Sequence, residues 1–373
     1  MKKTVLAVAA LSLATGAAFA QSSLQLYGLV DLSVENVKVD GKSGITRVST
    51  SNLATSRLGF KGTEDLGGGL KANFVLESAV GADVGSGGSA APTSGGSDVG
   101  ARFFDRSAWV GISGGFGAIR IGRMDSLLGA TTGNSSVMGN QAYDDFKIAK
   151  MVGADEWRRI DNAISYALPE IIPGLKAEVQ YSLAAGADGY ASPNNSLSGT
   201  QAEAANDDTD KQYGLSASYT SGPLTVGASM LRAKLDQTGS VEEGGTLGYA
   251  AYDFGSFKLI GYHQADKQTG TEKRKLTGIR VNVPVTSDLL ITASYASVKN
   301  TTYGGAGDND DAKILALKAI YSLSKRTAVY ALVTDVSNDP VSSLLAGASV
   351  TGTYVGAAGK DSRGIAFGVR HSF

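Results

Sequence analysis

Residues 175–183, LKAEVQYSL, show the pattern that decides the fold. Apolar side chains occupy every second position of this stretch, and lysine, glutamate, glutamine and serine occupy the positions between them. Such alternation is typical of a β-strand with one apolar and one polar face, because successive side chains of a strand point to opposite sides. The same period recurs in residues 24–35, 70–78 and 365–373. We therefore predict an all-β chain.

The connections between the predicted strands alternate in length. Seven short turns lie at residues 64–69, 113–117, 168–174, 220–223, 253–257, 283–288 and 322–325. Eight longer polar or glycine-rich and serine-rich connections lie at residues 40–52, 80–101, 124–158, 185–210, 236–244, 267–272, 301–310 and 337–360. Sixteen strands follow from this count, and short turns at one end with long loops at the other are typical of outer-membrane barrels. We predict a single-domain, 16-stranded antiparallel transmembrane β-barrel.

The first twenty residues, MKKTVLAVAALSLATGAAFA, have a basic start, a short apolar run and small residues at their end. These features predict a secretory signal peptide cleaved after Ala20, so that residues 21–373 form the mature barrel. The apolar run is shorter than the roughly 18 residues of a transmembrane helix. Cleavage removes Lys2 and Lys3 and changes the formal net charge from -1 to -3, so nucleic acid is not an expected partner.

Composition and context argue against catalytic and cofactor sites. The chain has no cysteine and two histidines, so neither a thiolate site nor a histidine-based metal site is expected, and no cofactor is predicted. His263 and His371 lie in alternating strands and are expected at the membrane interface rather than in a catalytic centre. Ser113 lies in a GISGG stretch similar to a hydrolase nucleophile elbow, but a second strand follows it where the elbow needs a helix. We interpret Ser113 as part of a hairpin turn.

The third long connection, residues 124–158, differs from an ordinary surface loop. Its sequence, MDSLLGATTGNSSVMGNQAYDDFKIAKMVGADEWR, contains Leu127, Tyr143, Phe146 and Trp157, apolar and aromatic side chains that a solvated connection does not need. Loops of this length are uncommon unless they carry function or are disordered. We predict that this third loop folds into the lumen and narrows it.

Five stretches resemble the general trimeric porins of Gram-negative outer membranes, most closely those of the beta-proteobacterial and neisserial kind. They are LYG at residues 26–28, SRLGFKGTEDLGGGLKANFVLES at 56–78, RSAWVGISGGFGAIRIGR at 106–123, RIDNAISY at 159–166 and GIAFGVRHSF at 364–373. The resemblance spans essentially the whole mature chain. It implies a homotrimer in contact with outer-membrane lipid and lipopolysaccharide, and a third loop that bends inward.

In this family, arginines of the wall face acidic residues of the inward loop. Arg57, Arg106 and Arg159 match the wall arginines, and Lys61 lies on the same strand face as Arg57. Strict alternation places Arg106 with the apolar set of its strand, although a bulge could turn it inward. The loop lacks the family's Pro-Glu-Phe-Gly-Gly segment, and its candidate acids are chosen by position alone. These candidates are Asp144, Asp145, Asp155 and Glu156. The resemblance also implies that the terminal Phe373 is a signal for the barrel-assembly machinery.

We therefore predict a general diffusion porin of the outer membrane. It would form a water-filled channel for passive transport of ions and small hydrophilic solutes, without enzymatic activity. The wall arginines favour a weak anion preference, against the opposing effect of the loop carboxylates. A substrate-specific channel would instead need an inward aromatic track or a dedicated site, and a barrel enzyme would need acids and a histidine or serine converging at one level. An adhesive barrel would need a lumen plugged by side chains, as in eight-stranded barrels.

Overall fold

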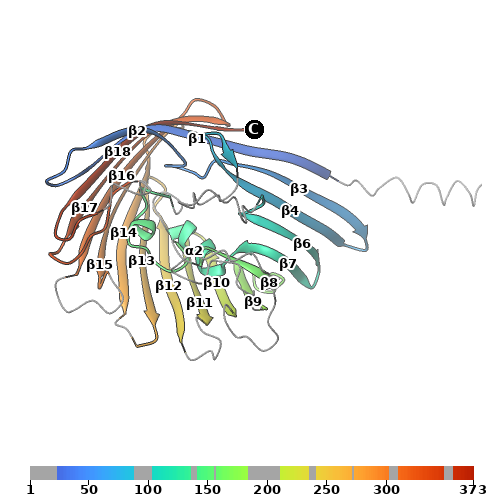
Figure 1. The fold of residues 1–373 in the computed structure, drawn as a ribbon. Helices are drawn as coiled ribbons and strands as arrows, with labels where there is room; N and C mark the ends of the chain where they lie inside the picture. Colours follow the sequence, from blue (N-terminus) through green and yellow to red (C-terminus); the bar gives the residue numbers. More distant parts are fainter. Residues whose placement is uncertain are drawn as a thin grey trace, which may run out of the picture.

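The structure, a computed structural model, describes residues 23–87, 103–135, 141–154, 157–183, 211–234, 241–270, 273–301, 310–347 and 356–373. Its sheet closes on itself as a barrel (Figure 1). The strands are β1 (Ser23–Val39), β2 (Ile45–Thr50), β3 (Arg57–Gly67), β4 (Leu70–Gly81), β5 (Ser86–Gly87), β6 (Ser107–Gly114), β7 (Gly117–Asp125), β8 (Arg159–Ala167), β9 (Leu175–Ser182), β10 (Gln212–Ser221), β11 (Leu224–Lys234), β12 (Glu242–Asp253), β13 (Lys258–Gln268), β14 (Arg274–Pro284), β15 (Leu289–Lys299), β16 (Ala312–Ser322), β17 (Thr327–Asn338) and β18 (Ser362–Ser372). Two helices, α2 (Leu127–Ser135) and α3 (Asp145–Ile148), follow β7.

The barrel wall has sixteen strand positions, as the sequence predicts. The sheet contains 18 strands, but β2 and β3 lie end to end beside β1, and the two-residue β5 forms only a small ladder with β4. All paired strands are antiparallel. Apart from the seam between β1 and β18, neighbouring strands of the wall are also consecutive in the chain. The seven predicted short turns join strands at one end of the barrel.

The seam of the barrel joins the two ends of the wall. β1 pairs with β18 from Leu29 opposite Ser372 to Val39 opposite Ser362. Beyond this ladder, the backbone amides of Gly28 and Phe373 each donate to the other residue's carbonyl oxygen at 3.1 Å. Closure leaves no free edge, so the backbone groups of the wall are paired as a membrane interior requires.

The first predicted long connection, residues 40–52, is partly strand. Residues 45–50 form β2 and pair with residues 32–37 of β1. Inside this ladder, Arg47 Nε donates to Glu35 Oε1 at 2.6 Å. The sequence predicts a polar loop here rather than a strand. The structure forms a strand because polar side chains of this stretch bond to side chains of β1 instead of to solvent.

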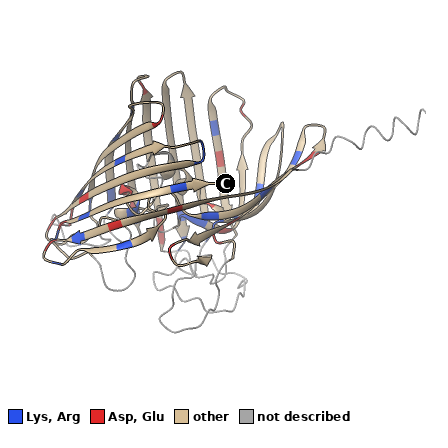
Figure 2. Ribbon diagram, turned by 90° about the horizontal axis from the view of Figure 1, so that it is seen from above, with Lys and Arg blue, Asp and Glu red and all other residues tan. Residues whose placement is uncertain are grey.

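The two faces of the wall follow the predicted alternation. Large apolar side chains on one face are exposed, for example Leu26, Val34, Leu315 and Phe367. The opposite face carries the buried side chains, charged ones among them, such as Glu35 and Asp266. Figure 2 marks the positions of the charged residues along the strands. An exposed apolar outer face is typical of a wall that contacts lipid. No helix within the described ranges is long and apolar enough to cross a bilayer.

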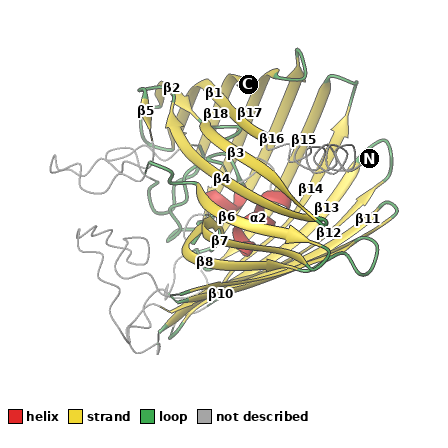
Figure 3. Ribbon diagram, turned by 90° about the vertical axis from the view of Figure 1, so that its right-hand side faces the viewer, coloured by secondary structure: helices red, strands yellow, loops and turns green. Residues whose placement is uncertain are grey.

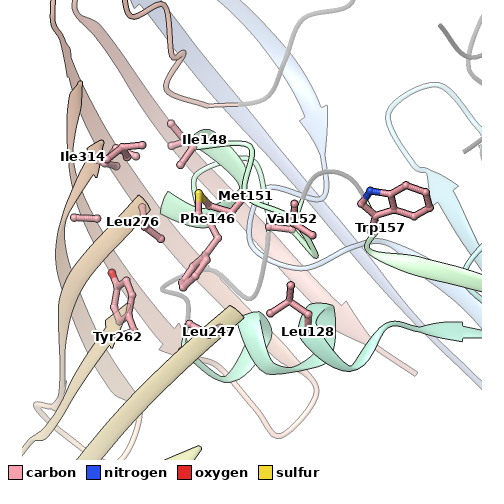
Figure 4. Close-up of a cluster of buried hydrophobic side chains, with 14 of the residues drawn as sticks. Leu128, Phe146, Ile148, Met151, Val152, Trp157, Leu247, Tyr262, Leu276 and Ile314 are labelled. Carbon is pink, nitrogen blue, oxygen red and sulfur yellow. The ribbon is translucent and has the colours of Figure 1, made fainter. Parts of the chain in front are cut away.

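The main apolar core lies between the β7–β8 connection and the inner face of the wall. Leu128, Phe146, Met151 and Val152 of the connection are fully buried there. They pack against wall residues of β11 to β16, among them Leu247, Tyr262, Leu276 and Ile314 (Figure 4). Helices α2 and α3 therefore lie within the ring of strands (Figures 1 and 3).

Candidate functional site

The described parts of the β7–β8 connection, residues 126–135, 141–154 and 157–158, pack together. The ends of the connection meet, because the amide of Ser126 donates to the carbonyl oxygen of Arg158 at 3.1 Å. Ser126 Oγ also accepts from the amide of Gly129 at 3.0 Å and so caps the start of α2. Asp144 caps α3 in the same way, accepting from the amide of Phe146 at 2.9 Å. Local capping thus defines both helices of a connection that alternation alone does not describe.

On one side of the lumen, the connection is bonded to β12 and β13. The amide of Val152 donates to Asp266 Oδ2 at 2.7 Å, and Trp157 Nε1 donates to Glu243 Oε2 at 2.7 Å. The hydroxyl of Tyr262 donates to Asp145. All of these groups are buried, where leaving a polar group without its hydrogen-bond partner costs about 1–3 kcal/mol.

On the other side of the lumen, the connection is bonded to strands near the seam. The hydroxyl of Tyr143 donates to Glu35 Oε2 on β1 at 3.0 Å. Thr334 Oγ1 on β17 donates to the carbonyl oxygen of Tyr143 at 3.2 Å. Burial raises the pKa of Tyr143, and the charge of Glu35 adds to the increase. Residues 126–158 are therefore attached to wall strands far apart around the ring.

A cluster of arginines surrounds the start and end of this connection. Its members are Arg57 on β3, Arg106 before β6, Arg123 on β7, Arg158, and Arg159 on β8. Arg106 interacts electrostatically with Arg57, Arg158 and Arg159, so these groups share one region of the lumen. We call this group the arginine cluster.

Three carboxylates hold the arginine cluster in place. Glu77 Oε1 lies 2.5 Å from Arg106 Nε and 3.9 Å from Arg57 Nη1. Asp125 lies 3.1 Å from Arg158 and 3.3 Å from Arg159, and Asp161 lies 2.5 Å from Arg123. The five arginines outnumber these three carboxylates, and buried Arg158 Nη1 makes no hydrogen bond to any described residue. Counted over these eight side chains, the arginine cluster has more positive than negative charges.

A second cationic group faces the connection from β14, β16 and β18. Arg280 interacts electrostatically with Asp144 and Asp145, and Lys318 interacts with Asp144, Arg280 and Arg370. Both aspartates are fully buried. Burial raises the pKa of Asp145 well above its ordinary value, and the charge of neighbouring Asp144 adds to the increase. These carboxylates are withdrawn from the water of the lumen.

The structure places the sequence-predicted residues in different surroundings. Arg57, Arg106 and Arg159 belong to one cluster, whereas Lys61 lies nearer the short turns, with its Nζ 5.1 Å from the centroid of the Tyr27 ring. Asp155 and Glu156 lie outside the described residues. Phe373 lies at the seam.

Arg106 is turned inward without a bulge in its strand. β6 begins at Ser107, so the alternation of that strand does not extend to position 106. The amide of Arg106 donates to the carbonyl oxygen of Glu77 at 3.1 Å, and its side chain pairs with the carboxylate of the same residue. Strand alternation therefore gives no prediction for the direction of Arg106, whereas the match to the family's wall arginines predicts that it faces the lumen.

Several charged residues of the site are missing from the sequence prediction. They are Glu77, Arg123, Asp125, Arg158, Arg280 and Lys318. Alternation gives a signal for some, since Glu77 lies on the polar face of β4. It gives no signal for the pairing between strands. In the described part of the chain, no group of three or more acidic or histidine side chains is placed to hold a metal ion.

Comparisons with known proteins give one consistent result. A model of the family described as "Gram-negative porin" matches residues 7–340. Outer membrane porin protein 32 of Delftia acidovorans is 34% identical over 392 residues, covering 100% of each chain. The major outer membrane protein P.IB of Neisseria lactamica is 33% identical over 189 residues, covering 48% of this chain and 50% of its own. The solved anion-selective porin from Comamonas acidovorans superposes with a TM-score of 0.74 at 26% identity, covering 95% of this chain and 100% of its own.

Proposed function

Because the chain belongs to the Gram-negative porin family, we propose that solutes cross it through a lumen constricted between residues 126–158 and the arginine cluster. The chain is an outer-membrane channel and not an enzyme. Residues 126–158 occupy part of the lumen and bond to both sides of it. The remaining aqueous path runs past charged side chains, and these decide which small hydrophilic solutes and ions pass most easily.

One observation carries a preference for anions. The loop acids Asp144 and Asp145 are 0% exposed, whereas the Arg57 side chain is 30% exposed and those of Arg158 and Arg159 are 21% and 18% exposed. Water in the lumen therefore reaches these arginine side chains, Arg57 above all, more readily than it reaches Asp144 and Asp145.

Exposed guanidinium groups beside low-dielectric walls raise the local concentration of anions. Asp125 is exposed too, but two arginines pair with it. The name of the Comamonas relative, an anion-selective porin, supports the same sign for this chain. Passive diffusion with a weak anion preference is the function that these residues support best.

Reversal potentials in a salt gradient test this proposal. The protein is reconstituted in a planar bilayer between unequal potassium chloride solutions, and Arg57→Gln plus Arg159→Gln is compared with the unchanged protein. The double variant should lose most of the anion preference. A matched control, Lys38→Gln plus Arg363→Gln, removes two exposed charges from the loop end of β1 and β18 and should leave the potential nearly unchanged. Cation preference in the unchanged protein would contradict the proposal.

The proposal extends to export and assembly. A signal peptide would be removed after Ala20, and Phe373 would be recognised by the barrel-assembly machinery. The mature chain would form a homotrimer in contact with outer-membrane lipid and lipopolysaccharide, which agrees with the exposed apolar side chains on β1 and β18. Mass spectrometry of the purified protein should give an N-terminus at Gln21. Cross-linking of membranes should give a three-chain product, and a product no larger than one chain would argue against the trimer.

A further inference from the structure

A cavity of about 430 Å³ lies on the short-turn side of the barrel, away from the arginine cluster. Strands β1, β3, β4, β6 and β7 contribute to it. The side chains that matter below are Gln25, Lys61, Asn73, Trp109, Ser113 and Arg120. Its volume lies within the range of roughly 300–1,000 Å³ typical of small-molecule sites.

These side chains lie on the lumen face of the wall. Along β6, Val110 and Ile112 are 59% and 49% exposed on the outer face, so Trp109 and Gly111 point inward. Trp109 packs at the edge of the inner apolar core. Gly111 stands directly opposite Arg120, and the stem of that arginine lies against the glycine, since Arg120 Cγ would be 3.0 Å from a Cβ at position 111. Lys61 lines the same cavity and is exposed, so the cavity is open to the water of the lumen.

The charges of the cavity are not balanced. Arg120 is paired with Glu178, and its guanidinium carbon lies 5.6 Å from the centroid of the Trp109 ring. Lys61 contacts the Tyr27 ring, and no carboxylate within the described ranges lies at ion-pair distance from it. A single uncompensated ammonium group remains.

The polar groups around this ammonium are already ordered. Thr63 donates to Asn73 Oδ1 at 3.0 Å, and Asn73 Nδ2 donates to Ser113 Oγ at 3.0 Å. One free cation, an indole ring and a short row of hydroxyl and amide groups suit a ligand with one negative charge and a flat apolar body. A phosphate or a dicarboxylate would need more than one free cation.

We propose that this cavity binds aromatic monocarboxylates, with the ring against Trp109 and the carboxylate on Lys61. The site gives the channel a solute-binding step on the short-turn side of the constriction. This inference rests on the proposed function in one respect, since the ligand reaches the cavity through the lumen.

Fluorine NMR titration with 4-fluorobenzoate measures this binding directly. The full chain, folded in detergent, is compared with Lys61→Gln and Trp109→Leu, and folding is verified by the heat-dependent shift in gel mobility. Lys61→Gln should weaken binding about tenfold, since a bond to a charged group contributes about 1.4 kcal/mol or more. Trp109→Leu should weaken it roughly threefold to tenfold, because it removes the contact between the two aromatic rings. Lys176→Gln is a matched control, because Lys176 lies on the same inner wall but lines a different cavity.

Acetate and cyclohexanecarboxylate complete the comparison. Acetate should fail to displace 4-fluorobenzoate at equal ionic strength, and cyclohexanecarboxylate should displace it less effectively than benzoate. Equal displacement by acetate and benzoate, or unchanged binding in Lys61→Gln, would overturn the inference, even if Trp109→Leu did not fold.

The titration needs no ion flow, so the two proposals fail separately. If the protein forms anion-selective channels but does not bind 4-fluorobenzoate, only the proposed binding site is overturned. If it binds 4-fluorobenzoate but opens no channels, only the proposed function is overturned.

Discussion

Replacing Phe146 with alanine tests what holds residues 126–158 in the lumen. Phe146 is 0% exposed, and its ring centroid lies 5.2 Å from that of Tyr262. Truncation of a buried phenylalanine costs about 3–5 kcal/mol. The wall keeps its own backbone ladders, so most of this loss should fall on the docking of the connection. A loss of that size changes the ratio of docked to undocked states by a factor of about a hundred to several thousand.

Single-channel recording and limited proteolysis measure this change. Phe146→Ala should give a larger and noisier conductance, because the connection then leaves the lumen part of the time, and should make residues 126–158 sensitive to protease. Phe146→Leu, which fills much of the same volume, is the control and should resemble the unchanged protein more closely. Wild-type conductance and protease resistance in folded Phe146→Ala would refute the reasoning.

Three further changes test other contacts. Because burial and Asp144 raise the pKa of Asp145, the folded state binds that proton more tightly, and this stabilisation is lost as pH rises through the raised pKa. Asp145→Asn should therefore gain more thermal stability, relative to the unchanged protein, at neutral than at acidic pH; an equal gain at both would contradict this. Trp157→Phe leaves buried Glu243 without its 2.7 Å donor and should lower the free energy of unfolding by about 1.5–3 kcal/mol in urea titration, with a smaller loss when Glu243→Gln is already present. Gly28→Val should destabilise the seam, because a Cβ at position 28 would lie 2.3 Å from the Phe373 ring; an unchanged melting temperature would argue against that packing.

Alternation predicts the wall well because each strand has one face toward lipid and one toward the lumen, and its own sequence differs between the two. Tyr181, Tyr219 and Tyr295 are exposed on the outer face, as their positions in alternating strands predict. The same reasoning fails where a strand ends. Arg106 lies one residue before β6, and its direction is decided by Glu77 on a neighbouring strand.

The interior of the barrel is less predictable for a related reason. Tyr143 donates to Glu35, and Tyr262 donates to Asp145, across sequence separations of more than a hundred residues. A local sequence pattern cannot predict such distant partners. Arg57, Arg106 and Arg159 match a family pattern and are predicted from it. Asp125 and Arg280, which contribute to the local balance of charge, belong to no such pattern.

The attachment of residues 126–158 to both sides of the lumen also has a mechanical consequence. Flattening a tube whose wall is one strand thick changes the distance between opposite parts of that wall. An internal strut, fixed to β1 and β17 at Tyr143 and to β13 at Val152, resists that flattening along its own direction. The connection that narrows the lumen would thus also keep its cross-section constant as the surrounding membrane is stretched or compressed.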